Sequence, residues 1–137
     1  MIPALQLPPI ERILCLGAHA DDIEIGCGGS LLRLLDERPG LQVLWVVATA
    51  QEPRAQEARD SAARFLQRAD QAEVRILDFQ DGYLPHSWAA LKDQFFAIRN
   101  DFLPQLVMTH RLEDRHQDHR LIAELTWNTF RDQIIWE

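Results

Sequence analysis

Two clusters of histidine and aspartate side chains are the residues of this sequence best suited to chemistry. The first is His19-Ala20-Asp21-Asp22, directly after an apolar run, and the second is the segment 110–119, which holds three of the chain's five histidines. Imidazole and carboxylate ligands together suit zinc better than magnesium or calcium, which prefer all-oxygen shells. A catalytic zinc ion takes three protein ligands and keeps a fourth position for water. The two clusters together therefore predict a zinc site.

Each cluster also has a simpler explanation when it is taken alone. Asp21 or Asp22 can cap the helix that follows, and Asp118 suits the first turn of a later helix. Helix capping leaves the histidines of the second cluster unexplained. His116 and His119 are three residues apart at a helix start, which places both on the same side of that helix. Because Asp21 and Asp22 are adjacent, they point in different directions, so one can bind an ion while the other faces the open coordination position.

The segments that must position these clusters alternate between strands and helices. Apolar and β-branched runs predict strands over residues 12–17, 42–49, 74–77, 106–109 and 134–136. Helical periodicity predicts helices over residues 54–69, 88–102 and 121–130, with Ser87 as an N-cap; the glycine cluster 26–30 is expected to open a helix ending near residues 38–40, and Asp81-Gly82 predicts a turn. This alternation predicts a Rossmann-like three-layer α/β/α fold with a mainly parallel sheet in strand order 3-2-1-4-5.

That strand order makes the first and fourth strands neighbours. Ligands of such folds bind at the carboxyl ends of the strands. The cluster at 19–22 follows the first strand and the cluster at 110–119 follows the fourth. We therefore expect the two clusters, far apart in sequence, to converge on one crevice.

Composition and charge narrow the class of protein. A chain of 137 residues suits one domain, and 14 basic against 21 acidic residues give a net charge of −7. That balance disfavours nucleic acids and anionic membranes as partners. Residues 1–10 have three prolines and no basic residue, unlike a signal peptide, and no apolar run approaches the ~18 residues of a membrane span. We expect a cytoplasmic protein without a membrane span.

The two clusters resemble motifs of the LmbE-like, or PIG-L-like, de-N-acetylases. Members of that family carry His-Pro-Asp-Asp, then a glycine-rich turn, and later His-x-Asp-His before a helix. Here the corresponding segments are His19-Ala20-Asp21-Asp22, Gly26-Cys27-Gly28-Gly29 and His116-Gln117-Asp118-His119, and the resemblance covers residues 13–130. Ala20 replaces the usual proline, and Ile23 stands where relatives often have glutamate, but neither difference removes a ligand.

The resemblance implies a zinc-dependent hydrolase that removes the N-acetyl group from an N-acetylglucosamine-type sugar conjugate. It implies that His19, Asp22 and His119 bind zinc, and that Asp21 is the general base that activates the zinc-bound water. The expected partner is therefore a small-molecule N-acetylated amino-sugar conjugate, and a homo-oligomer is left open as the assembly state.

The resemblance also implies roles for further polar residues. His116 is expected to assist the tetrahedral intermediate, with Asp118 orienting it. The segment that begins at Arg54 resembles the family's Arg-x-x-Glu helix start, so Arg54 is expected to contact substrate, although an ordinary solvated helix residue explains it equally well. His110 and Asp114 complete the expected substrate-binding set.

Two alternatives to a deacetylase follow from the same sequence. A nucleotide-binding module is suggested by the glycine cluster, but Gly-x-Gly-x-x-Gly fails because Leu31 stands where the third glycine belongs. An inactive, partner-binding fragment would keep the fold and the motifs without turnover. Relatives in the family are generally longer, so we expect residues 1–137 to form a single LmbE-like domain lacking the family's C-terminal part. The apolar segment 134–136 would then form a sheet edge that needs covering.

Overall fold

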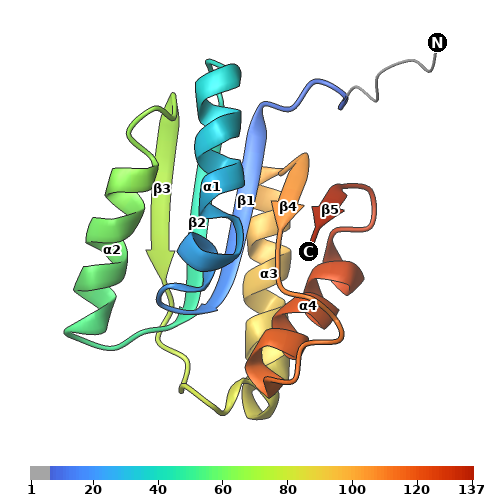
Figure 1. Cartoon of the computed structure of the whole chain (residues 1–137). Coiled ribbons are helices and arrows are strands. Elements are labelled where there is room, and N and C mark those ends of the chain that lie inside the picture. The colour runs from blue at the N-terminus through green and yellow to red at the C-terminus, as the bar shows by residue number, and fades with distance from the viewer. Residues whose placement is uncertain (1–6) are drawn as a thin grey trace.

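A five-stranded parallel sheet forms the centre of the computed structural model, which describes residues 7–137 (Figure 1). Residues 1–6, part of the segment compared above with a signal peptide, lie outside the described residues. The strands are β1 (Arg12–His19), β2 (Gln42–Thr49), β3 (Gln71–Ile76), β4 (Leu106–Met108) and β5 (Ile134–Trp136). Their order is β3-β2-β1-β4-β5 and each neighbouring pair is parallel. The predicted fold class and strand order are confirmed.

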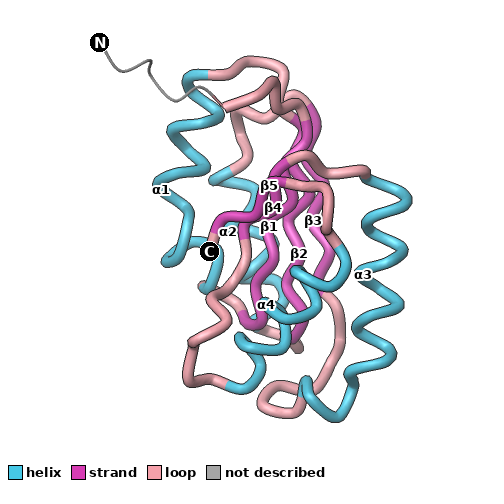
Figure 2. Tube along the Cα trace, turned by 90° about the vertical axis from the view of Figure 1, so that its right-hand side faces the viewer, coloured by secondary structure: helices cyan, strands magenta, loops and turns pink. Residues whose placement is uncertain are grey.

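Helices cover both faces of the sheet. They are α1 (Asp22–Glu37), α2 (Arg54–Phe65), α3 (Trp88–Phe102), which follows the short 3₁₀ helix η1 (Leu84–Ser87), and α4 (Gln117–Thr129). Figure 2 shows the sheet from its edge, with α1 and α3 on opposite sides. Within residues 7–137, no helix combines the length and the apolar character needed to cross a membrane.

Alternate residues of the central strands contribute to two separate cores. Cys15 and Trp45 pack with α1 and α2, whereas Leu14 and Leu44 pack with α3 and α4. Successive side chains of a strand point to opposite faces, so a strand covered on both faces must be apolar throughout. That requirement explains the unbroken apolar runs of β1 and β2, which hold the carboxyl end of the sheet in place.

The glycine cluster lies inside a helix, which corrects the expectation that it opens one. α1 begins at Asp22, so Gly26 and Gly28 fall within its first two turns. A Cβ atom at Gly28 would lie 2.6 Å from Cε1 of Phe65 on α2. The glycine therefore allows α1 and α2 to pack closely, and the helix propensity lost at this position is offset by that contact.

Other element boundaries also differ from the prediction. β3 begins at Gln71 rather than at residue 74, because its first three residues are exposed at the sheet edge and carry no apolar signal. α2 ends at Phe65 rather than at residue 69. Ser87 precedes α3 as predicted but makes no side-chain cap hydrogen bond, since η1 leads directly into the helix.

Candidate metal centre

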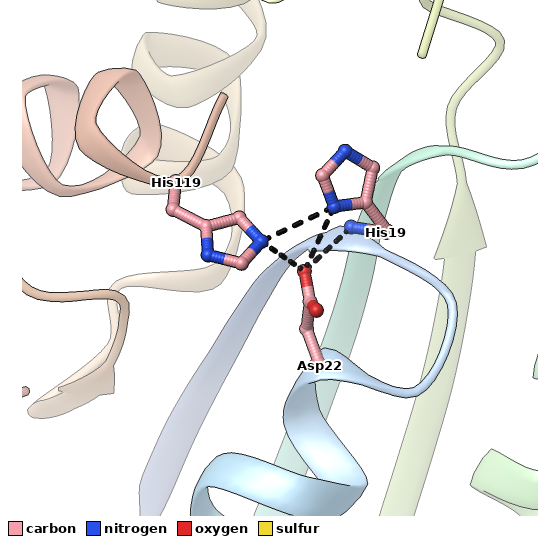
Figure 3. A group of neighbouring side chains, drawn as sticks. All are labelled: His19, Asp22 and His119. Atoms are coloured by element: carbon pink, nitrogen blue, oxygen red, sulfur yellow. Dashed lines mark hydrogen bonds and ion pairs between the residues drawn. The ribbon is translucent and has the colours of Figure 1, made fainter. Parts of the chain in front are cut away.

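Three side chains from three elements converge at the carboxyl ends of β1 and β4. His19 ends β1, Asp22 begins α1, and His119 lies in the first turn of α4. Figure 3 shows them pointing toward one another. His19 Nδ1 lies 3.2 Å from His119 Nε2, and Asp22 Oδ2 lies 3.4 Å from the first nitrogen and 3.3 Å from the second. We call these three atoms the metal triangle.

The dimensions of the metal triangle fit a tetrahedral zinc ion. Zinc bonds of about 2.0–2.1 Å place two tetrahedral ligand atoms about 3.3–3.4 Å apart. The observed separations are 3.2, 3.3 and 3.4 Å. Two imidazole nitrogens and one carboxylate oxygen are also a donor set that zinc accepts, with the fourth position left for water or substrate. The convergence predicted from the two sequence clusters is present in the structure.

Both histidines of the metal triangle have a carboxylate behind them. His19 Nε2 lies 3.0 Å from Asp118 Oδ2, and His119 Nδ1 lies 3.1 Å from Asp114 Oδ2. Histidines that ligate metals usually donate the proton of their second ring nitrogen to such a partner, which fixes the ring orientation and tautomer. This arrangement directs His19 Nδ1 and His119 Nε2 toward the same point.

Two side chains of the metal triangle, Asp22 and His19, have strongly shifted pKa values. Burial alone would raise the pKa of Asp22, but its contacts with His110 and with the ring and backbone N–H of His19 hold that pKa well below the usual range. Asp22, opposed by partial burial and helped by Asp118, raises the pKa of His19 to about 9. Asp22 is therefore held in the ionised form that a carboxylate needs in order to bind a metal.

Asp21 lies outside the metal triangle and faces Arg54. Its side chain is 65% exposed, and its Oδ2 lies 3.1 Å from Arg54 Nη2. Its backbone has φ of 81°, a left-handed conformation that is uncommon for residues other than glycine and that occurs often at functional sites. The adjacent carboxylates of Asp21 and Asp22 therefore have different surroundings, and Asp21 is free to meet a substrate or water.

His116 lies beside the metal triangle without being part of it. Its ring stacks on His119 at 4.6 Å and meets His19 edge-on at 4.7 Å between centroids. As the N-cap of α4, it accepts the backbone N–H of Asp118 at Nδ1, over 3.1 Å. With Nδ1 used as an acceptor, the neutral ring carries its proton on Nε2, which is then a hydrogen-bond donor. The main chain of Asp118 thus contacts His116, while its carboxylate turns to His19.

Two cavities flank the metal triangle. One, of about 620 Å³, is lined by His19, by residues 49–54 and by residues 79–81; we call it the crevice. The other, of about 320 Å³, is lined by polar and apolar residues that include Asp22, His110, Asp114, Cys27 and Trp136. Arg54 therefore lines the crevice.

His110 and Asp114 lie against the residues of the metal triangle. His110 Nε2 is 3.3 Å from Asp22 Oδ2 and accepts the backbone N–H of Ala18 over 3.0 Å. Asp114 contacts His119 and also accepts the backbone N–H of His116, and this second bond is the first cause that lowers the pKa of Asp114. Each of the two residues therefore contacts a candidate ligand, His110 contacting Asp22 and Asp114 contacting His119.

Asp81, predicted from the sequence only as part of a turn, also contacts His19 of the metal triangle. Its carboxylate is 79% exposed, and its Oδ1 lies 3.1 Å from His19 Nε2. It belongs to the loop between β3 and α3. Because the strands are parallel, this loop leaves the sheet at the carboxyl ends of the strands, as the two motif loops do. A polar residue after the third strand of the predicted sheet was the one signal that could have pointed to it.

Comparison with known proteins identifies the family. Residues 14–130 match the model of the PIG-L family, described as GlcNAc-PI de-N-acetylase. The chain therefore belongs to the PIG-L, or LmbE-like, family, which confirms the resemblance found in the sequence.

Individual relatives agree with this assignment. The chain is 32% identical over 129 residues to a protein of Escherichia coli (strain K12) described as uncharacterized deacetylase YaiS, with 83% of this chain and 65% of YaiS covered. It is similar to the N,N'-diacetylchitobiose deacetylase from Pyrococcus horikoshii (TM-score 0.67, 26% identity, 89% of this chain and 50% of that one). It is also similar to the conserved protein TT1542 from Thermus thermophilus (TM-score 0.66, 28% identity, 90% and 56%). The chain thus spans between 50% and 65% of the length of these relatives.

Proposed function

We propose that the chain is the catalytic part of a zinc-dependent hydrolase that removes the N-acetyl group from an N-acetylglucosamine-type sugar conjugate. The observation that carries this proposal is the metal triangle, with its zinc-like spacing and a carboxylate behind each histidine. Membership of the PIG-L family and the deacetylase names of two relatives support the reaction class.

The residues around the metal triangle supply the steps of an amide hydrolysis. A zinc ion held there would polarise the acetamide carbonyl and lower the pKa of a water molecule to about 7. Asp21 takes a proton from the attacking water, because its exposed carboxylate is not used by the metal triangle. His116 donates from Nε2 to the carbonyl oxygen as negative charge develops on it. The products are acetate and a free amino sugar, and Asp21 and His116 are the two candidates to protonate the leaving amine.

The crevice supports a sugar as the substrate. Its volume of about 620 Å³ lies within the range of small-molecule sites, roughly 300–1,000 Å³. Arg54 can bind the conjugate at its rim, and the exposed carboxylate of Asp81 can accept hydroxyl hydrogens. Substrate binding by His110 and Asp114 stays a prediction, since their contacts with Asp22 and His119 support a role in orienting these candidate ligands.

The nucleotide-binding alternative is disfavoured by charge. The amino end of α1, where a phosphate would bind, carries the carboxylates of Asp21 and Asp22. Those carboxylates repel a phosphate and attract a cation. A cytoplasmic location, homo-oligomerisation and the inactive-fragment alternative stay predictions from the sequence.

Amine release from N-acetylglucosamine conjugates tests the proposal. Zinc-loaded protein is incubated with lipid-linked, nucleotide-linked and thiol-linked conjugates, and we expect release that stops with a chelator and returns with zinc. Asp93→Asn, which removes an exposed carboxylate on α3, is the matched control and should keep the wild-type rate. Zinc-loaded protein that releases no amine from any conjugate would contradict the proposed hydrolase and favour the inactive, partner-binding alternative.

A further inference from the structure

One buried carboxylate joins the segment 80–84, which leads into η1 and includes its first residue, to the metal triangle. The side chain of Asp118 is 0% exposed. Its Oδ2 accepts the backbone N–H of Gly82 over 2.7 Å and its Oδ1 accepts that of Leu84 over 3.1 Å. The same Oδ2 lies 3.0 Å from His19 Nε2. Burying a carboxylate away from water costs free energy unless it is hydrogen-bonded or paired. The two amides and His19 together offset that cost for Asp118.

The loop that Asp118 holds is a wall of the crevice. Residues 79–81 line the crevice, and Asp81 places its carboxylate 3.1 Å from the same His19 nitrogen. A second tie comes from Gln117, whose Nε2 donates to the carbonyl oxygen of Gly82 over 3.1 Å. The wall is thus fastened to the first turn of α4, which also carries His119.

We propose that Asp118 is a positioning residue that couples the loop 80–84 to His19. One carboxylate then sets both the wall of the crevice and the ring orientation in which His19 presents Nδ1 to a metal. The part of this proposal that concerns zinc rests on the proposed function, whereas the tie between the loop and α4 does not. Because coupling between two sites is reciprocal, zinc on His19 should order the loop, and an ordered loop should favour zinc.

Hydrogen exchange of the Gly82 and Leu84 amides in the metal-free protein tests the tie. Asp118→Asn keeps the size of the side chain but replaces one acceptor oxygen by a donor NH₂ group, which cannot accept both amides. We expect both amides to exchange at least tenfold faster than in wild type, with the amides of β1 and β2 unchanged. The control Asp93→Asn should match wild type throughout.

Zinc then tests the coupling. In wild type, zinc should slow exchange at Gly82 and Leu84, and Asp118→Asn should weaken zinc binding by about 10–100-fold, the usual effect of losing a partner behind a ligand. A raised KM for the conjugate should accompany the faster loop exchange. Zinc that binds the wild type stoichiometrically but leaves both amides unaffected would overturn the coupling.

The metal-free exchange data keep this proposal separate from the proposed function. Unchanged exchange at Gly82 and Leu84 in metal-free Asp118→Asn would overturn the tie, whatever the protein binds or hydrolyses. If Asp118→Asn does not fold, the metal-free wild type supplies the test. The amides of Gly82 and Leu84, which donate to Asp118, should exchange at least tenfold more slowly than the amide of Asp81, which does not bind Asp118. Equal exchange rates at the three amides would contradict the tie.

Discussion

Asp21 and Asp22 are neighbours in the chain, but their carboxylates have different contacts, from which we expect different roles. Asp22 lies within 3.4 Å of both nitrogens of the metal triangle, whereas the exposed Asp21 pairs with Arg54. We expect Asp21→Asn to keep stoichiometric zinc and to lose roughly 10²-fold or more in kcat, the contribution of a general base. Asp22→Asn should instead weaken zinc binding. Elemental analysis and kcat on the same samples check both, and near-wild-type kcat in Asp21→Asn would exclude it as the base.

His116 is both the N-cap of α4 and the proposed oxyanion donor, and two substitutions separate these roles. His116→Ala should cost about 0.5–2 kcal/mol of folding free energy through the lost cap. It should also cost roughly 10²-fold or more in kcat with zinc still bound. His116→Asn restores a favoured N-cap but not the Nε2 donor, so it should recover stability and not turnover. Urea unfolding and kcat measure the two effects, and zinc lost from His116→Ala would make His116 a ligand.

Zinc binding should release a proton, because His19 is cationic in the metal-free protein at neutral pH. Asp22, with Asp118, raises the pKa of His19 to about 9 against partial burial. A ligating imidazole must be neutral, so apparent zinc affinity should rise with pH and level off above about 9. The sign for stability is opposite: the raised pKa stabilises the metal-free fold fully below about 6.5, and this is lost as pH rises through about 9.

Calorimetry in two buffers of different ionisation enthalpy measures this proton release. We expect close to one proton per zinc from His19 at pH 7, and His119→Ala, which weakens the site, is the control for binding elsewhere. A zinc-binding enthalpy that does not depend on the buffer at pH 7 would contradict the cationic state of His19.

Because α1 packs on α2, alanine substitutions at two neighbouring glycines of α1 should have opposite effects on the stability of the protein. A Cβ at Gly28 would lie 2.6 Å from Phe65, whose ring is also packed against Trp45, whereas a Cβ at Gly29 meets nothing within 4 Å. Gly29→Ala should stabilise the protein by about 0.5–1 kcal/mol through helix propensity. Gly28→Ala gains the same propensity but incurs overpacking of roughly 1–3 kcal/mol, so it should destabilise. Urea unfolding compares the variants, and equal stabilisation by both would show that the α1–α2 contact is loose.

The elements were predictable where the sequence has strong periodicity, and less so where packing decides. β1 and β2 are continuous apolar runs, and the stripe of α3 repeats clearly, so element order and sheet topology followed from the sequence. The start of β3 was missed because an edge strand exposes polar residues. The start of α1 was missed because Gly28 reflects contact with Phe65 rather than a helix boundary.

The candidate site was predictable to the level of its two motifs. His19 and His119 follow neighbouring strands, so strand order alone brings them together. The carboxylate contacts of Asp118 with the Gly82 loop, and the approach of Asp81 to His19, depend on side-chain directions across three elements. No local pattern encodes such directions, and only the folded chain reveals them.

Metal removal should lower the free energy of unfolding of the whole chain, because the metal triangle joins β1, α1 and α4. A ligand that binds only the folded state stabilises it by about 2.7 kcal/mol at a concentration 100 times its Kd. We expect zinc to raise the Tm of the wild type and a chelator to reverse the rise. Thermal unfolding with and without zinc measures this effect, and His119→Ala should show little response. A wild-type Tm independent of zinc would mean that no zinc site forms in the folded chain.

The way in which Asp118 holds its loop determines where the crevice can be redesigned. The carboxylate binds main-chain N–H groups of Gly82 and Leu84, which any residue except proline can supply. The side chains of Gln80 and Asp81 line the crevice but take no part in those two bonds. A combinatorial library at these two positions can therefore explore the selectivity of the proposed hydrolase while the anchoring amides stay in place. Gly82 should be kept constant in such a library, because its φ of 81° penalises other residues.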